Sequence, residues 1–273
     1  MKKQTKYTAK TPDQQGLIQY TAEEDSVWKV LYERQIQVVQ NRACLEFIEG
    51  LDRLQMPFDR VPQLNDISKI LMPLTGWSVV SVPSLISTDH FFTLLSQRQF
   101  PAATFIRIPE ELDYLEEPDI FHEFFGHCPL LTHKVYADFM QKYGQMALSV
   151  PENDREFLAR LFWFTVEFGL IKSKEGSRCY GGGILSSKNE TIYAIESNLP
   201  VQKNFEILDL LRTPYRIDIM QSIYFVIQDF NQLYQLLDSD LGSVINEARR
   251  LGEFSPSFTI TNYSEENDEW VTC

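Results

Sequence analysis

The chain has 273 residues, of which 44% are hydrophobic and 13% aromatic, so it is long enough to bury a substantial core. Its formal net charge of −13 disfavours nucleic acids and anionic membranes as partners, because both require a basic protein surface. The basic start of the chain is not followed by an apolar run, and the four cysteines show no paired spacing. We therefore expect a cytoplasmic protein with free thiols.

Taken in chain order, residues 1–20 are polar and aperiodic, which predicts a mobile tail. Residues 21–273 contain no linker or repeat and should form one domain. A first helix should begin after Thr21, where acidic residues open a helical apolar pattern. Apolar spacing predicts further helices at 65–72, 87–98, 119–126, 133–148, 154–171 and 217–238. Alternation predicts strands at 103–108 and 190–196. We expect a mainly α fold with a small amount of β and no βαβ units.

Two of the four histidines, His122 and His127, lie five residues apart in the stretch E-P-D-I-F-H-E-F-F-G-H-C-P-L. Residues five apart in an α-helix point about 140° away from each other, whereas the zinc-protease pattern H-E-x-x-H uses a spacing of four. We expect Gly126 to adopt a positive φ and end the helix before Pro129, so that His127 folds back toward His122. The pair is then either a metal site or two ordinary polar residues at a helix end.

Glu167 is the candidate for a third metal ligand. It lies in the apolar stretch R-L-F-W-F-T-V-E-F-G-L, where a buried carboxylate needs a cation to compensate its desolvation. That cation is either a lysine or an arginine, such as Arg160 or Arg178, or a metal ion. Two histidines and one carboxylate with open positions form the facial triad of non-haem Fe(II) oxygenases.

Three blocks of the sequence resemble the pterin-dependent aromatic amino acid hydroxylases. The blocks are P-D-I-F-H-E-F-F-G-H-C-P-L, W-F-T-V-E-F-G-L and Y-G-G-G-I-L-S-S, in that order. The similarity extends from about residue 20 to about residue 240 and is strongest to the bacterial phenylalanine 4-hydroxylases. It implies a single mainly α catalytic domain that binds Fe(II) through His122, His127 and Glu167 and uses a tetrahydropterin and molecular oxygen. There is no heptad tail for a tetramer, so we expect a monomer or small homo-oligomer.

The resemblance also implies which residues bind the amino acid. Arg107 would bind the substrate carboxylate with its guanidinium fork, and Asp119 would orient that arginine. Trp163 would line the ring pocket, while Gly183 and Ser186 would lie near the substrate and the iron ligands. The simpler alternatives are a surface ion pair for Arg107, a helix-start acid for Asp119 and a core side chain for Trp163.

The pterin would contact a different pair of residues. Phe91 matches a phenylalanine that stacks on the pterin, and Glu123 would reach the pterin through a water molecule. An exposed helix acid is the alternative for Glu123. The remaining histidines, His90 and His133, match no role in the family.

Two positions favour phenylalanine as the substrate. Tryptophan hydroxylases of the family tend to carry phenylalanine where this chain has Trp163, and tyrosine hydroxylases tend to carry an acid near the position of Ile217. An apolar residue there leaves a phenolic hydroxyl without a partner, which costs about 1–3 kcal/mol. A register one residue different would place Asp218 there instead.

Two other functions remain open from the sequence. The same histidines, with Glu123 as the base, would serve a zinc hydrolase, although the spacing disfavours it. A non-enzymatic binding module could also keep the fold, although all three ligand positions are intact. We expect the hydroxylation of L-phenylalanine to L-tyrosine.

Overall fold

The computed structural model describes residues 7–83, 86–115, 117–237 and 240–258. The α-helices are α1 (Ala22–Val38), α2 (Leu45–Leu54), α3 (Leu64–Thr75), α4 (Thr88–Ser96), α5 (Cys128–Leu131), α6 (Lys134–Ser149), α7 (Arg155–Phe162), α8 (Gly182–Leu185), α9 (Lys188–Glu196), α10 (Ile207–Leu211), α11 (Phe230–Leu236) and α12 (Leu241–Leu251). The strands are β1 (Ser78–Val82), β2 (Gln99–Ala103), β3 (Leu170–Ser173), β4 (Gly176–Cys179), β5 (Val201–Asn204) and β6 (Ile223–Ile227). The prediction of a mainly α fold with a small amount of β is confirmed.

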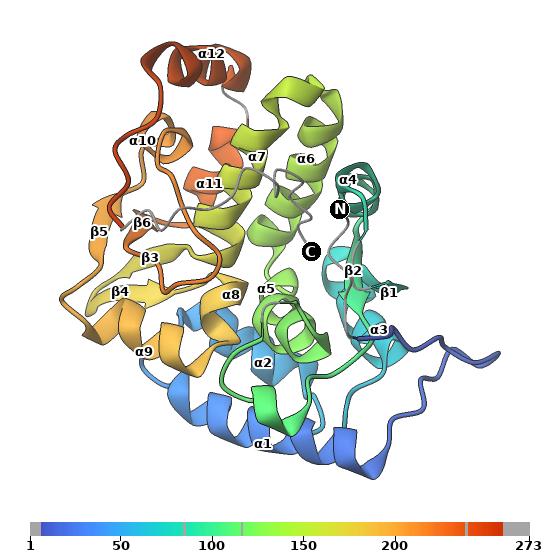
Figure 1. Cartoon of the computed structure of the whole chain (residues 1–273). Coiled ribbons are helices and arrows are strands. Elements are labelled where there is room, and N and C mark those ends of the chain that lie inside the picture. Colours follow the sequence, from blue (N-terminus) through green and yellow to red (C-terminus); the bar gives the residue numbers. More distant parts are fainter. Residues whose placement is uncertain (1–6, 84–85, 116, 238–239, 259–273) are drawn as a thin grey trace.

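The strands form two separate sheets on either side of the helices (Figure 1). In the four-stranded sheet the order is β4-β3-β6-β5, with an antiparallel β3–β4 hairpin and parallel pairing of β6 with both β3 and β5. The other sheet is a parallel pair, β1 and β2, connected through α4. Our expectation that the chain has no βαβ units is therefore wrong. Helices α5, α6 and α7 lie between the sheets, and α1 runs along the base.

Aromatic rings from α1 and α2 hold the segment that carries the first histidine. Phe121 and Phe125 stack on each other with their centroids 5.1 Å apart. Trp28 packs edge-on against Phe121 at 5.5 Å, and Phe47 packs edge-on against Phe125 at 5.9 Å. Aromatic pairs of this kind add to the stability of burial alone, so the backbone around His122 is anchored on one side by the core.

Most predicted helices have counterparts in the structure. The first is α1, where Thr21 and Glu24 form a reciprocal capping box. Helices α3, α4 and α6 match the predictions at 65–72, 87–98 and 133–148. The prediction at 154–171 holds through α7 and the turn Trp163–Glu167, after which β3 begins at Leu170.

Two segments have the opposite secondary structure to the one predicted. The expected strand at 190–196 is the helix α9, which begins with the Ser187 hydroxyl accepting a hydrogen bond from the Glu190 backbone. The expected helix at 217–238 contains β6 before α11. Strand β6 has parallel neighbours on both sides and is mostly buried. Such strands have continuous apolar runs that resemble a buried helix in sequence.

The strand predicted at 103–108 is also wrong, because β2 ends at Ala103. The residues beyond it are held by side chains of the N-terminal segment instead of by a strand ladder. The Tyr20 hydroxyl donates to the Thr104 carbonyl, and the Tyr7 ring stacks on Phe105 with centroids 4.4 Å apart. Ile18 is 3% exposed. The described part of the predicted tail, residues 7–20, therefore contacts the domain, and residues 1–6 lie outside the described residues.

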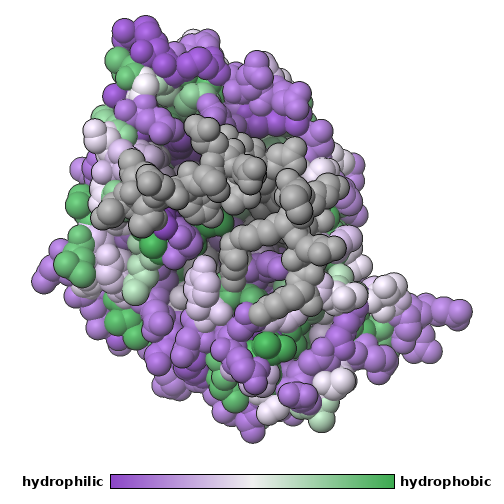
Figure 2. Space-filling model, in the orientation of Figure 1, coloured by the Kyte–Doolittle hydropathy of each residue, from purple (hydrophilic) through white to green (hydrophobic). Residues whose placement is uncertain are grey.

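The surface agrees with the acidic, polar composition. On the face shown in Figure 2, hydrophilic residues predominate and hydrophobic ones are scattered among them. Within the described ranges, no helix has both the length and the apolar character needed to cross a membrane.

Candidate active site

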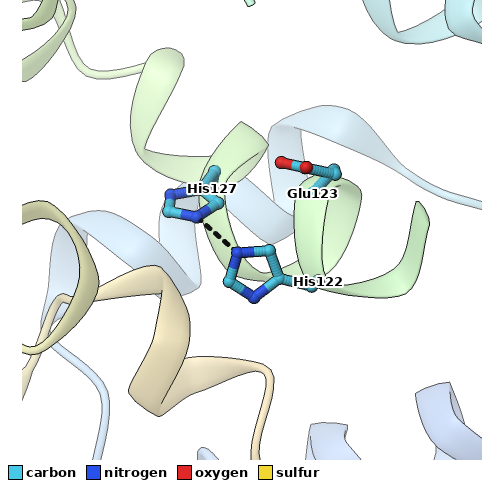
Figure 3. A group of neighbouring side chains, drawn as sticks. All are labelled: His122, Glu123 and His127. Carbon is cyan, nitrogen blue, oxygen red and sulfur yellow. Dashed lines mark hydrogen bonds between the residues drawn. The ribbon is translucent and has the colours of Figure 1, made fainter. Parts of the chain in front are cut away.

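The two histidines are brought together by a π-helical turn, His122–His127. The Cys128 N–H donates to the Glu123 carbonyl, five residues back. The wider turn brings residues five apart onto the same face, as residues four apart are in an α-helix. The two Nε2 atoms are 2.9 Å apart, and Figure 3 shows the nitrogen-bearing edges of the two rings pointing toward each other.

Our prediction that Gly126 ends the helix at a positive φ is wrong. The helix continues into α5, and Gly126 is absent from the described glycines with positive φ. A Cβ at Gly126 would lie 2.7 Å from the Gly182 carbonyl oxygen. The glycine is therefore required by close packing against the segment 181–183.

Glu167 comes from a second π-helical turn, Trp163–Glu167, closed by the Phe168 N–H donating to the Trp163 carbonyl at 2.8 Å. The Glu167 side chain faces both histidines. Its Oε1 lies 3.3 Å from His127 Nε2, and its Oε2 lies 3.7 Å from His122 Nε2. Thus the two π-helical turns bring two imidazoles and a carboxylate, all side chains of types that can bind a metal, into one small volume.

An arginine does not compensate this carboxylate in the part of the chain that the structure describes. Arg160 pairs with Glu253, and Arg178 pairs with Glu175. Glu167 is 5% exposed, and its Oε1 is a buried atom without a hydrogen-bond partner. The arginine alternative for Glu167 is therefore wrong.

The donor set fits a metal ion. Ligand atoms about 2.1 Å from a common ion and at right angles to one another would be about 3 Å apart, close to the measured separations. Burial lowers the pKa of His122 to about 4, which favours the neutral imidazole that binds metals. Burial raises the pKa of Glu167, but His127 and His122 outweigh it, so that the pKa lies below its usual value and the carboxylate is ionised.

Ser186 fixes the tautomer of His122. Its Oγ donates to the Gly182 carbonyl at 2.9 Å, so its only proton is used there. The same Oγ lies 2.9 Å from His122 Nδ1 and must accept that nitrogen's proton. This leaves the Nε2 lone pair directed toward His127 and Glu167, as metal binding requires.

The glycine-rich segment 181–183 packs directly on the ligands. A Cβ at Gly182 would lie 2.3–2.6 Å from three atoms of the His127 ring. A Cβ at Gly183 would lie 3.0 Å from the Phe168 ring and 3.1 Å from the Glu167 carbonyl oxygen. Gly183 therefore packs closely against the Glu167 backbone.

Glu123 is a second carboxylate near the histidines, with ligand atoms of all three residues within 4.8 Å. Figure 3 shows its side chain to one side of the pair. It is 1% exposed, so it is not the exposed helix acid of the simpler alternative. Burial, together with the nearby Glu167, raises its pKa well above the usual value. A neutral Glu123 is a poorer metal ligand and a poorer general base than an ionised Glu167.

Arg107 and Asp119 form a buried ion pair beside the histidines. Arg107 donates from Nε to Asp119 Oδ2 and from Nη2 to Oδ1, both at 2.8 Å. Asp119 Oδ1 also accepts from the His122 backbone N–H at 3.0 Å. At 7% exposure, Arg107 is not part of a surface ion pair. Asp119 therefore connects the backbone of His122 to the Arg107 guanidinium. The Nη1 atom of that guanidinium takes no part in the bonds to Asp119.

Trp163 lies at the edge of the site, half-buried, with its indole between two rings. The Phe168 centroid is 4.4 Å away, and the Tyr215 centroid is 4.8 Å away. The indole N–H donates to Gln221 Oε1 at 3.0 Å. Sequence reasoning missed Gln221, because no local pattern pairs residues 58 positions apart.

The structure does not bring two predicted residues to the histidines. Phe91 is 1% exposed and packs edge-on against Phe92 and Phe162, so its stacking on a pterin stays a prediction. Ile217 is half-buried in the loop before β6 and has no described contact with the metal-ligating residues. Its place in the pocket also stays a prediction.

Comparisons with known proteins agree with this geometry. The family model of the biopterin-dependent aromatic amino acid hydroxylases matches residues 2–246. A phenylalanine-4-hydroxylase from Pseudomonas aeruginosa is 50% identical, covering 94% of this chain and 97% of the relative. The apo structure of a cold-active phenylalanine hydroxylase from Colwellia psychrerythraea superposes with a TM-score of 0.90 at 48% identity, covering 92% of this chain and 97% of that one.

A phenylalanine hydroxylase from Chromobacterium violaceum with bound Fe(III) superposes with a TM-score of 0.86 at 41% identity, covering 96% of this chain and 93% of that one. The family match covers most of the chain and includes both π-helical turns and the glycine-rich segment. The chain belongs to the biopterin-dependent aromatic amino acid hydroxylases.

Proposed function

We propose that this protein is an iron- and tetrahydropterin-dependent monooxygenase that hydroxylates L-phenylalanine to L-tyrosine with molecular oxygen. The observation that carries the proposal is the convergence of His122 Nε2, His127 Nε2 and the Glu167 carboxylate within 2.9–3.7 Å of one another. This donor set is typical of non-haem Fe(II) oxygenases. The relatives named phenylalanine hydroxylases, at 41–50% identity, support phenylalanine as the substrate.

His122, His127 and Glu167 would hold Fe(II), which would activate oxygen, and a bound tetrahydropterin would supply the electrons. The protein orients the reactants and excludes water. Ser186 keeps the metal-facing nitrogen of His122 free of a proton. Glu123 stays neutral in its buried position and donates a hydrogen bond toward the pterin side of the site. A zinc hydrolase would instead need an ionised Glu123 as its base, which burial disfavours.

The amino acid is held at its two ends. Arg107 binds the carboxylate through Nη1, while Asp119 fixes the opposite edge of the guanidinium. Trp163 forms a wall of the ring pocket, and Gly183 and Ser186 line the side next to the ligands. Ile217 faces the para edge of the ring. An apolar group there rejects tyrosine, because the phenolic hydroxyl would be buried without a partner.

We further propose that residues 21–273 form a single catalytic domain and that Phe91 contacts the pterin. The enzyme acts as a monomer or small homo-oligomer without nucleic-acid or membrane partners. Cys44, Cys128 and Cys179 are free thiols, which supports a reducing compartment such as the cytoplasm.

Product analysis tests this function. Protein loaded anaerobically with Fe(II) is given oxygen, tetrahydropterin and phenylalanine, tyrosine or tryptophan in turn. We expect tyrosine from phenylalanine and at least about tenfold lower kcat/KM for the other two amino acids. His122→Ala should abolish the product, and His133→Ala, a half-buried histidine outside the triad, should not. Wild-type protein that forms no tyrosine would contradict the proposal.

A further inference from the structure

One glutamine side chain connects the wall of the proposed ring pocket to the loop that carries Ile217. Gln221 lies two residues before β6 and is 3% exposed. Its Oε1 accepts the Trp163 indole proton at 3.0 Å. Its Nε2 donates to the carbonyls of Arg216 at 2.8 Å and of Ile219 at 3.2 Å. The side-chain amide thus spans residues 216–219, which include Ile217, and holds them against the indole.

The orientation of this amide is determined by its partners. The indole N–H is only a donor and the two carbonyls are only acceptors, so the amide oxygen must face Trp163 and the nitrogen must face the loop. All hydrogen-bonding groups of the side chain are used. A rotated amide would place its donor against the indole donor and remove the bonds to the Arg216 and Ile219 carbonyls, which is costly for a buried amide.

The backbone of Gln221 is held by a buried carboxylate. Glu190, which is 6% exposed, accepts the Gln221 backbone N–H at 3.0 Å through Oε1. The hydroxyl of Tyr224 donates to the same oxygen. Glu190 lies in the first turn of α9, where its backbone N–H donates to the Ser187 hydroxyl. Ser187 directly follows Ser186, which bonds to His122. Contacts therefore run continuously from the ligand side of the site to the ring pocket.

We propose that Gln221 is a positioning residue for substrate specificity, which fixes the Trp163 wall and the Ile217 loop at the separation that suits a phenylalanine ring. Gln221 does not touch the substrate and acts through these two residues. The inference rests on the proposed function, since it takes Trp163 and Ile217 as the walls of the ring pocket. It adds a residue that no local motif of the sequence indicates.

Three variants test it. Gln221→Leu has similar volume and removes all three side-chain hydrogen bonds, whereas Gln221→Glu keeps the acceptor for the indole and removes the donors to the loop. Gln63→Leu is the matched control, because the Gln63 amide likewise clamps backbone, at Ile18 N and O, in another part of the domain. The measurements are kcat/KM for phenylalanine, tyrosine and tryptophan, tyrosine formed per tetrahydropterin oxidised, and bound iron.

We expect Gln221→Leu to lower the preference for phenylalanine by about five- to tenfold and to reduce the coupling of pterin oxidation to hydroxylation, with normal iron content. Gln221→Glu should lower the preference for phenylalanine and the coupling by an intermediate amount. This variant provides the test if Gln221→Leu does not fold. Gln63→Leu should keep the wild-type preference and coupling. In a Trp163→Phe background, Gln221→Leu should change the preference by less than about twofold, because the indole donor is gone.

The inference would be overturned if the Gln221 variants kept the wild-type preference for phenylalanine and the wild-type coupling of pterin oxidation to hydroxylation. It would also be overturned if these two quantities fell no further in the Gln221 variants than in Gln63→Leu. An equal effect with and without the Trp163 indole would overturn it as well, because the residue would then act by general destabilisation. Wild-type protein that forms no tyrosine would overturn the proposed function and this inference together. Normal wild-type activity beside unaffected Gln221 variants would overturn the inference alone.

Discussion

Replacing Asp119 with asparagine should lower both the stability of the protein and its affinity for the substrate. Asp119 is fully buried and accepts hydrogen bonds from Arg107 N, Nε and Nη2 and from His122 N, at 2.8–3.0 Å. An asparagine has a single acceptor oxygen, and its NH₂ group would face donors. Removing one partner of a buried ion pair costs about 3–5 kcal/mol, because the other charge is left uncompensated.

We therefore expect Asp119→Asn to lower the melting temperature by about 10 °C, at roughly 2–4 °C per kcal/mol for a chain of this size. The affinity for phenylalanine should fall at least about tenfold, because the Arg107 fork is no longer held. Differential scanning calorimetry and steady-state kinetics measure the two effects. The variant Arg107→Met/Asp119→Leu should regain much of the stability, since both charges are gone, but none of the affinity.

The stability difference should also depend on pH. Burial alone would raise the pKa of Asp119, but Arg107 and the two backbone donors lower it below its usual value. A carboxyl group with a lowered folded-state pKa contributes its stability above the unfolded pKa of about 3.9, and that contribution is lost as pH falls through the folded pKa. The difference between wild type and Asp119→Asn should be constant near neutral pH and shrink below about pH 4. A melting temperature within about 2 °C of wild type, with unchanged KM, would refute this reasoning.

Four other substitutions test separate parts of the site. His122→Ala and Glu167→Gln should each reduce bound iron, measured by mass spectrometry of the metal, to below about a tenth of wild type, while circular dichroism shows a retained fold. Gly182→Ala should lower both iron content and melting temperature, because its Cβ would lie 2.3–2.6 Å from the His127 ring; a variant with normal values would contradict the close packing. Ile217→Asp should narrow the preference for phenylalanine over tyrosine about tenfold in a competition assay, and an unchanged ratio would place Ile217 away from the ring.

The parts of the fold that depend on local signals could be predicted from the sequence. Helix α1 begins at a capping box, and α6 follows its apolar spacing, so both were found. Strand β6 was not found, because its character depends on parallel partners distant in the chain. Helix α9 was read as a strand, because a short alternating run does not distinguish the two.

The candidate site likewise has features that the sequence predicts and features that it does not. The five-residue spacing of His122 and His127 indicated that an ordinary α-helix does not suffice, but a π-helical turn depends on a hydrogen-bond register that composition does not encode. The family motifs named the predicted ligands, yet nothing local indicated that Gln221 contacts Trp163. Long-range side-chain contacts of this kind become visible only when the packing is known.

The central claim is that iron and pterin bound to this chain insert one atom of molecular oxygen into phenylalanine. The most direct measurement uses ¹⁸O₂ with the Fe(II)-loaded protein, tetrahydropterin and L-phenylalanine, followed by mass spectrometry of the amino acid product. The account predicts tyrosine that carries one ¹⁸O atom, formed only when Fe(II), pterin and oxygen are all present. Unlabelled tyrosine, or tyrosine formed without pterin or iron, would contradict it.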